Sequence, residues 1–95
     1  MSTYANVEIE GREFNVRSDG GDKETIRDYV REYVAKIKGK VKSDYLLKAV
    51  LDAITADSAT DYYAPFSLGY CESTSYNWKI EIGKGGGVKI KSKRR

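Results

Sequence analysis

Few side chains in this sequence belong to the types on which common enzyme chemistry depends. The chain contains no histidine and one cysteine, Cys71. Without histidine there is no Ser–His or Cys–His nucleophile pair, and no histidine general base or metal ligand. A single cysteine forms neither an intrachain disulfide nor a zinc site. We therefore predict a protein that is not an enzyme, has no catalytic residues and needs no cofactor.

Paired carboxylates are the remaining candidates for holding a metal ion. Asp57 and Asp61 lie four residues apart, and a second pair, Asp19 and Asp22, lies three residues apart. Oxygen ligands at such spacings suit Mg²⁺ or Ca²⁺. Neither pair fits the EF-hand pattern, and each also suits the polar end of a helix. We predict no metal site.

A glycine-rich segment with one lysine, residues 83–87, suggests a phosphate-binding loop. A P-loop requires Gly-x-x-x-x-Gly-Lys followed by Ser or Thr, between a strand and a helix. Here Gly85 follows Lys84, and strand patterns lie on both sides of the segment. The segment therefore predicts a flexible hairpin loop instead.

The strongest functional feature is a basic block near the C-terminus. Residues 84–95 carry six lysine or arginine side chains and no acidic one. Lysines at alternate positions of a strand share one face, and aromatic side chains on a neighbouring strand offer a stacking surface for single-stranded bases. Cations also neutralise phosphates, so the block predicts a surface for nucleic acid or another polyanion such as an acidic protein. The expected contact residues are Lys84, Lys89, Lys91, Lys93, Arg94, Arg95, Tyr76 and Trp78.

The basic residues also have a purely structural explanation. Lysines on an edge strand keep it from pairing with other chains, and Tyr76 and Trp78 would then be core residues. The alternate lysines over residues 36–42 either extend the basic surface or follow the negative end of a helix dipole. The sequence leaves these alternatives open.

Aromatic and apolar clusters predict protein contacts as an alternative function. The chain has eight tyrosines, and exposed tyrosine is typical of recognition surfaces. The segment around Pro65 would suit a small effector or inhibitor that blocks a partner protein. A predicted helix over residues 43–57 is apolar on most sides, which favours a homodimer. The expected protein-contact residues are Tyr62, Tyr63, Phe66, Leu46 and Val50.

The composition predicts one soluble domain that acts inside a cell. The chain has 95 residues, of which 40% are hydrophobic, and a formal net charge of +3. No apolar run approaches the roughly 18 residues of a membrane span. Glu8 and Glu10 interrupt the position where a signal peptide is apolar. We expect a cytoplasmic, single-domain protein over residues 1–95, with a mobile basic tail at 92–95.

Apolar residues alternate with polar ones over residues 7–16, which predicts a hairpin. Its expected turn is type II′ at Gly11 and Arg12, with Ile9 opposite Phe14.

Helical spacing predicts a first helix that starts from an N-cap at Asp22, and a second helix over 43–57. Alternation predicts strands over 76–82 and 88–91, and residues 69–75 form either a loop or a weak strand. We predict an α+β fold in the order β-β-α-α-(β)-β-β. Two helices would pack on one face of an antiparallel sheet built from the N-terminal and C-terminal hairpins.

Several segments share order and residue type with a known family. They are Val-Glu-Ile-Glu-Gly-Arg-Glu-Phe-Asn-Val at 7–16, Ile26, Lys-Ile at 36–37, Leu-Lys-Ala-Val-Leu-Asp-Ala-Ile at 47–54 and Asp-Tyr at 61–62. The pattern resembles the hairpin–helix–helix head of the ZapA family of bacterial cell-division proteins, which bind and bundle FtsZ filaments. The resemblance covers residues 6–62 and implies a head that dimerises. The family continues its second helix into a coiled coil, whereas Pro65 and a basic hairpin follow here.

Overall fold

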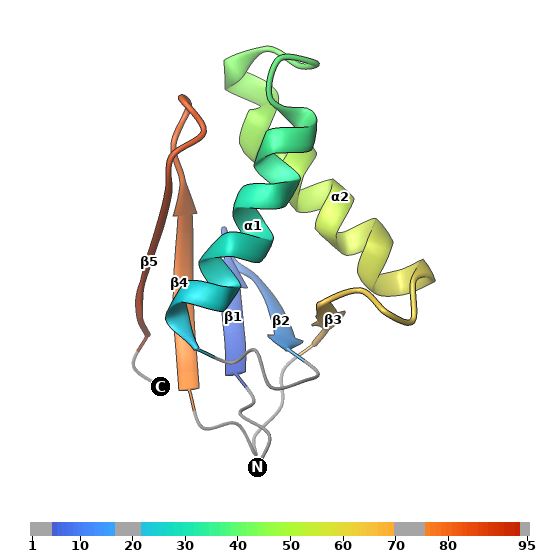
Figure 1. Ribbon diagram of the computed structural model, residues 1–95, viewed down its shortest axis with the longest axis vertical. Helices are drawn as coiled ribbons and strands as arrows, with labels where there is room; N and C mark the ends of the chain where they lie inside the picture. The colour runs from blue at the N-terminus through green and yellow to red at the C-terminus, as the bar shows by residue number, and fades with distance from the viewer. Residues whose placement is uncertain (1–4, 17–21, 70–75, 94–95) are drawn as a thin grey trace.

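The protein forms a five-stranded sheet with two helices on one of its faces (Figure 1). The computed structural model describes residues 5–16, 22–69 and 76–93. The elements in chain order are β1 (Ala5–Ile9), β2 (Arg12–Val16), α1 (Lys23–Ile37), the 3₁₀ turn η1 (Ser43–Tyr45), α2 (Leu46–Thr60), β3 (Phe66–Leu68), β4 (Tyr76–Ile82) and β5 (Val88–Ser92). The predicted fold class and element order are confirmed. A short strand, β3, precedes the segment 69–75, and residues 70–75, for which the sequence allowed a loop or a weak strand, lie outside the described residues.

The sheet is mixed rather than purely antiparallel. Its strand order is β3-β2-β1-β4-β5, and β1 pairs with β4 in parallel while the other neighbours are antiparallel. Parallel pairing requires a long crossover connection, and the helices and β3 supply it. The sequence prediction of an antiparallel sheet was therefore wrong at the one pair that joins the two hairpins.

The turn of the first hairpin lies one residue earlier than predicted. Glu10 and Gly11 occupy its centre with φ angles of 48° and 84°, the two positive values of a type I′ turn. Ile9 therefore lies opposite Arg12, and Val7 opposite Phe14. The predicted register was wrong by two residues, which leaves every apolar side chain on its predicted face.

Arg12 is part of β2 rather than the turn, and its side chain reaches α2. Its Nη1 lies 3.5 Å from the Asp52 carboxylate and donates to the Thr55 hydroxyl at 3.0 Å. These contacts join the hairpin to the second helix and suit the observed register, which puts Arg12 on the helix-covered face.

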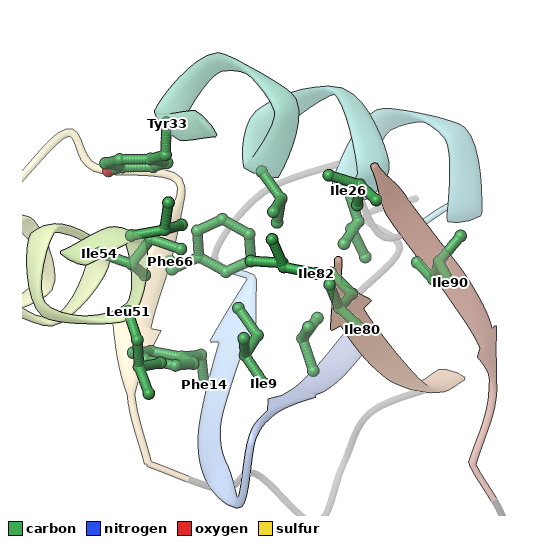
Figure 2. Close-up of a cluster of buried hydrophobic side chains, with 14 of the residues drawn as sticks. Ile9, Phe14, Ile26, Tyr33, Leu51, Ile54, Phe66, Ile80, Ile82 and Ile90 are labelled. Atoms are coloured by element: carbon green, nitrogen blue, oxygen red, sulfur yellow. The ribbon is translucent and has the colours of Figure 1, made fainter. Parts of the chain in front are cut away.

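The core lies between the sheet and the helices (Figure 2). Phe66 of β3 meets Phe14 and Tyr29 edge-on, with ring centroids 6.0 and 6.1 Å apart. Such pairs add to the stability that area burial alone provides. The largest fully buried side chains are Phe14, Phe66, Ile9, Ile26, Ile54, Ile80, Val7, Val16, Val30 and Val50.

The two helices begin and end differently from one another. Asp22 is the N-cap of α1, as predicted, and its carboxylate accepts from the Thr25 amide at 3.2 Å. The second helix was predicted from a Ser43 cap, but Ser43 opens a 3₁₀ turn and no side chain caps either segment. The helix also continues past Asp57 to Thr60, because no proline or glycine interrupts it there.

We expect Glu10→Asn to stabilise the protein by about 1 kcal/mol, since glutamate resists the positive φ that asparagine tolerates. Urea unfolding of the variant measures this change. Glu10→Gln is the matched control, because it removes the same charge but keeps a side chain unsuited to positive φ. Equal effects of the two substitutions would contradict the role of the backbone angle.

Tyr33 connects the two helices through its hydroxyl, which donates to Asp57 Oδ2 at 2.7 Å. Burial, followed by this hydrogen bond, raises the pKa of the Tyr33 hydroxyl above its usual value of 10.0. The pKa of Tyr33 is higher in the folded protein than in the unfolded chain. The protonated hydroxyl therefore contributes its full stabilisation of the fold below pH 10, and this contribution is lost as the pH rises further.

We expect Tyr33→Phe to lower the free energy of unfolding by about 1 kcal/mol at neutral pH. The difference from the parent protein should narrow above about pH 10, where folding no longer favours the protonated hydroxyl. Chemical denaturation at pH 7 and pH 10.5 tests both expectations. Tyr45→Phe, at a position that is 61% exposed, should change neither value.

Candidate anion-binding site

The lysines and the aromatic residues of the predicted basic surface lie on opposite faces of the sheet. Trp78 pairs with Ser92, and Ile80 pairs with Ile90, so Tyr76 and Trp78 belong to the helix-covered face. Lys89 and Lys91 alternate with buried residues and belong to the other face. The predicted combination of stacking rings and lysines is therefore not formed. The two rings instead stack on each other, with centroids 5.5 Å apart.

Ser92 and Lys93 were expected in a mobile tail but are held by the sheet. Ser92 is the last residue of β5, and the Lys93 amide donates to the Asn77 carbonyl at 2.9 Å. The Lys93 ammonium forms ion pairs with Glu8 and, at 3.4 Å, with Glu13. The predicted contact residues Arg94 and Arg95 lie outside the described residues.

This ion-paired cluster changes the titration of its members. The hydrogen bond from Lys93 holds the pKa of the Glu8 carboxyl below 4.5. The same hydrogen bond raises the pKa of Lys93 above 10.5. Lys93 therefore stabilises the sheet, and two carboxylates neutralise its charge.

Lys84 lies where the glycine-rich loop contacts the helices. A side chain added at Gly86 would approach Val34 Cγ1 and Lys38 Cδ at 3.2 Å, so the loop packs against the end of α1. The Lys84 ammonium lies 3.1 Å from the Asp44 carboxylate. The predicted hairpin loop is confirmed, and it brings Lys84 to Asp44 and Gly86 to Lys38.

A groove of about 350 Å³ follows the outer edge of β5. It is lined by two cations of α1, Lys23 and Arg27, and by Lys89 and Lys91 of β5. Val88 and Ile90 supply its apolar floor, and Glu81 is its acidic member. The edge of the sheet thus carries four cationic side chains that come from two elements.

Sequence reasoning missed Lys23 and Arg27. The Arg27 side chain is only partly exposed and lines the groove. The signal in the sequence was the four-residue spacing from Lys23 to Arg27, which puts both side chains on one side of the helix. What that side contacts depends on where β5 lies.

Arg27 carries the least satisfied polar group of the groove. Its Nε atom is buried and has no hydrogen-bond partner. Among the described residues, Lys91 forms an ion pair with Glu81 at 2.8 Å, whereas Lys23, Arg27 and Lys89 form none. Three of the four cations of the groove are therefore without an internal counter-ion, and an anionic group in the groove would supply one.

A larger hollow of about 660 Å³ lies at the end of β1, and its charges are mixed. Glu8, Glu10 and Glu81 oppose Arg31, Lys79 and Lys89 around it. Opposite charges in equal number do not favour an anion. The hollow therefore fits the predicted binding chemistry less well than the smaller groove along β5.

Three of the five predicted protein-contact residues are core residues. Leu46, Val50 and Phe66 are at most 2% exposed, because they form the contact of α2 and β3 with the rest of the chain. They do not form part of the described surface. Tyr62 and Tyr63 are 76% and 88% exposed, and their rings meet edge-on at 5.3 Å.

Within residues 5–16, 22–69 and 76–93, no three His, Cys, Asp or Glu side chains gather as metal ligands would. In those same ranges, no helix is long and apolar enough to cross a membrane. Asp57 is a hydrogen-bond partner of Tyr33. Cys71 and Asp19 lie outside the described residues.

Comparison of the chain with protein-family models, with curated proteins and with solved structures finds no match. The resemblance to the ZapA head therefore stays a prediction. The site has to be interpreted from its own residues.

We expect Lys93→Met to destabilise the protein near neutral pH, because it leaves Glu8 and Glu13 side by side without their shared cation. The lowered pKa of Glu8 stabilises the fold above pH 4.5, and this contribution is lost as the pH falls further. The variant should therefore lose less stability than the parent between pH 6 and pH 3 on thermal unfolding. Lys84→Met, which breaks an exposed pair, should behave like the parent.

Proposed function

We propose that this chain is a non-catalytic binding protein that takes an anionic macromolecule along the groove between α1 and β5. The observation that carries the proposal is the set of four cations around one sheet edge: Lys23, Arg27, Lys89 and Lys91. A single carboxylate, Glu81, opposes them in the lining of the groove.

The spacing of these cations supports binding of an extended anion. Lys23 and Arg27 lie one helical turn apart, and residues two apart on a strand are separated by about 6.6 Å. All such distances are shorter than the Debye length of about 8 Å at physiological salt. The two charges within each pair are therefore not screened from one another, and both can act on the same bound anion.

Ion pairs reduce the charge of two other lysines of the C-terminal block, and at the edge itself Lys91 pairs with Glu81. Glu8 and Glu13 neutralise Lys93, and Asp44 faces Lys84. Lys23, Arg27 and Lys89 make no such pair within the described residues. Three of the four cations at the edge are thus unpaired within the described residues and can contact a partner.

The expectation of stacked nucleic-acid bases is less well supported than the expectation of anion binding. Stacking requires rings beside the cations. Tyr76 and Trp78 lie on the other face from Lys89 and Lys91. Phosphates are still candidates for the cations, so a nucleic acid would bind here through its backbone alone.

The homodimer expectation loses its motivating observation. The second helix was expected to be apolar on most sides, but α1 and β3 already cover its buried face, which includes Leu51 and Ile54. Lys48 and Asp52 are exposed on the other side. The exposed pair Tyr62 and Tyr63 favours a protein contact as a second candidate function.

We expect the chain to bind both poly-glutamate and single-stranded DNA at low salt, and binding should weaken as salt is raised. The double variant Arg27→Glu with Lys89→Glu should weaken both affinities by more than about tenfold, because charges near the anion are inverted. Fluorescence anisotropy with labelled probes measures these affinities.

The matched control is Lys36→Glu with Lys48→Glu, which makes the same change in net charge at two exposed helix positions. Tyr62→Ser with Tyr63→Ser should also leave anion binding unchanged. The proposal is wrong if neither probe binds at low salt, or if the control variant weakens binding as much as the groove variant.

A further inference from the structure

β5 is the outermost strand of the sheet and follows one side of it (Figure 1). The hydrogen bonds from Gly83 N to Gly87 O and from Lys93 N to Asn77 O identify which residues bond to β4. Antiparallel pairs alternate between bonded and non-bonded residues. The backbone N–H and C=O groups of Val88, Ile90 and Ser92 therefore point away from β4.

The exposed backbone and the four cations occupy the same edge. The groove along β5 is lined by Val88 and Ile90, whose backbone groups point outward, and by cations on both sides. Lys23 and Arg27 border it on the helix side, and Lys89 and Lys91 on the other face. A ligand that uses both features must carry backbone hydrogen-bonding groups as well as negative charge.

We propose that the occupant of this edge is an extended acidic polypeptide segment that adds to β5 as a sixth strand. The inference rests on the anion-binding function proposed above and names its partner class. Strand addition supplies affinity through main-chain hydrogen bonds, and side chains supply specificity.

The charge pattern matches such a segment on both faces. Side chains of an added strand point alternately to the two faces of the sheet. Acidic residues on one face would meet Lys23 and Arg27, and those on the other would meet Lys89 and Lys91. A segment with consecutive or nearly consecutive Asp and Glu, about 16 Å long over five residues, fits this arrangement.

Arg27 supplies the second observation that points to a carboxylate. Its side chain lines the groove, and it forms no ion pair among the described residues. Arginine binds carboxylates through two parallel N–H donors. A Glu or Asp on the helix side of an added strand would pair with this guanidinium.

A second copy of the chain does not suit the edge. Pairing two copies of β5 would bring Lys89 and Lys91 of each against those of the other, and like charges on neighbouring strands are destabilising. A nucleic acid would use the cations but has no main-chain groups at strand spacing, so it would leave Val88, Ile90 and Ser92 unpaired. An acidic strand would pair with the cations and also with the outward backbone groups.

The test uses a capped eight-residue peptide with Asp or Glu at two of every three positions and Val at the third. One comparison probe has proline in place of each Val, which keeps the charge but prevents strand pairing. The other is a single-stranded oligonucleotide. We expect the first peptide to bind at least about tenfold more tightly than its proline counterpart, and to slow amide hydrogen exchange at Val88 and Ile90.

Ser92→Pro is the sharpest protein variant, because it removes an outward N–H without removing a bond to β4. Proline is tolerated on an edge strand at such a position. The variant should weaken binding of the acidic peptide by about fivefold or more and leave binding of the oligonucleotide unchanged. Ser92→Ala, which keeps the N–H, is the matched control and should bind both probes like the parent.

The outcomes separate the two proposals. If all three probes bind equally and no amide of β5 is protected, strand addition is wrong while the anion-binding function stands. If none of the probes binds at low salt, both proposals are wrong. Preference for the oligonucleotide, without protection of β5, would identify a nucleic acid as the partner instead.

Discussion

The parallel pairing of β1 with β4 is the contact on which the rest of the structure depends. It joins the two hairpins directly, whereas along the chain they are separated by the helices and β3. Val7 and Ile9 of β1 and Ile80 of β4 are fully buried beneath the helices. Burial of such side chains contributes about 1.5–3 kcal/mol each, which offsets the entropic cost of the long crossover. Without this pair, each hairpin alone would be marginal in water.

The same pairing decides which strand is exposed. Because β1 bonds to β2 on one side and β4 on the other, β5 has a neighbour only in β4 among the strands that the structure describes. Its buried residues Val88 and Ile90 then lie next to α1, which brings Lys23 and Arg27 to the same edge. The candidate site is therefore a product of strand order. None of its cations lies near the others in the sequence except within each pair.

Some basic residues form ion pairs that hold the fold together, whereas others remain exposed at its surface. Lys93 holds β1, β2 and the end of β5 together through Glu8 and Glu13, so its charge is used internally. Lysine on the exposed face of β5 protects the edge against pairing with a second copy. In the binding mode proposed above, the same charge favours an acidic strand, so one arrangement of side chains would serve both protection and recognition. We expect binding of an acidic strand to depend on the salt concentration, because the groove is open to solvent.

Local pattern was enough to predict the fold class, the element order, the Asp22 cap and the faces on which apolar residues lie. These features depend on period two or period 3.6 and on chemistry within a few residues. Alternation along the strand also places Lys89 and Lys91 on one face of β5 and Ile90 on the other. The mistake over Tyr76 and Trp78 came from treating neighbours in sequence as neighbours on one surface, although β4 and β5 present two faces each.

Tertiary structure decided the features that depend on distant segments. The parallel β1–β4 pair, the burial of Phe66, Leu46 and Val50, and the approach of Arg27 to β5 all join residues far apart in the chain. Sequence spacing carries no information about which edge of a sheet is left open or which helix crosses it, because these depend on the total burial of apolar area over the whole chain. The sequence by itself determined a basic, histidine-free α+β domain; the order of its strands decided where that charge meets an unpaired backbone.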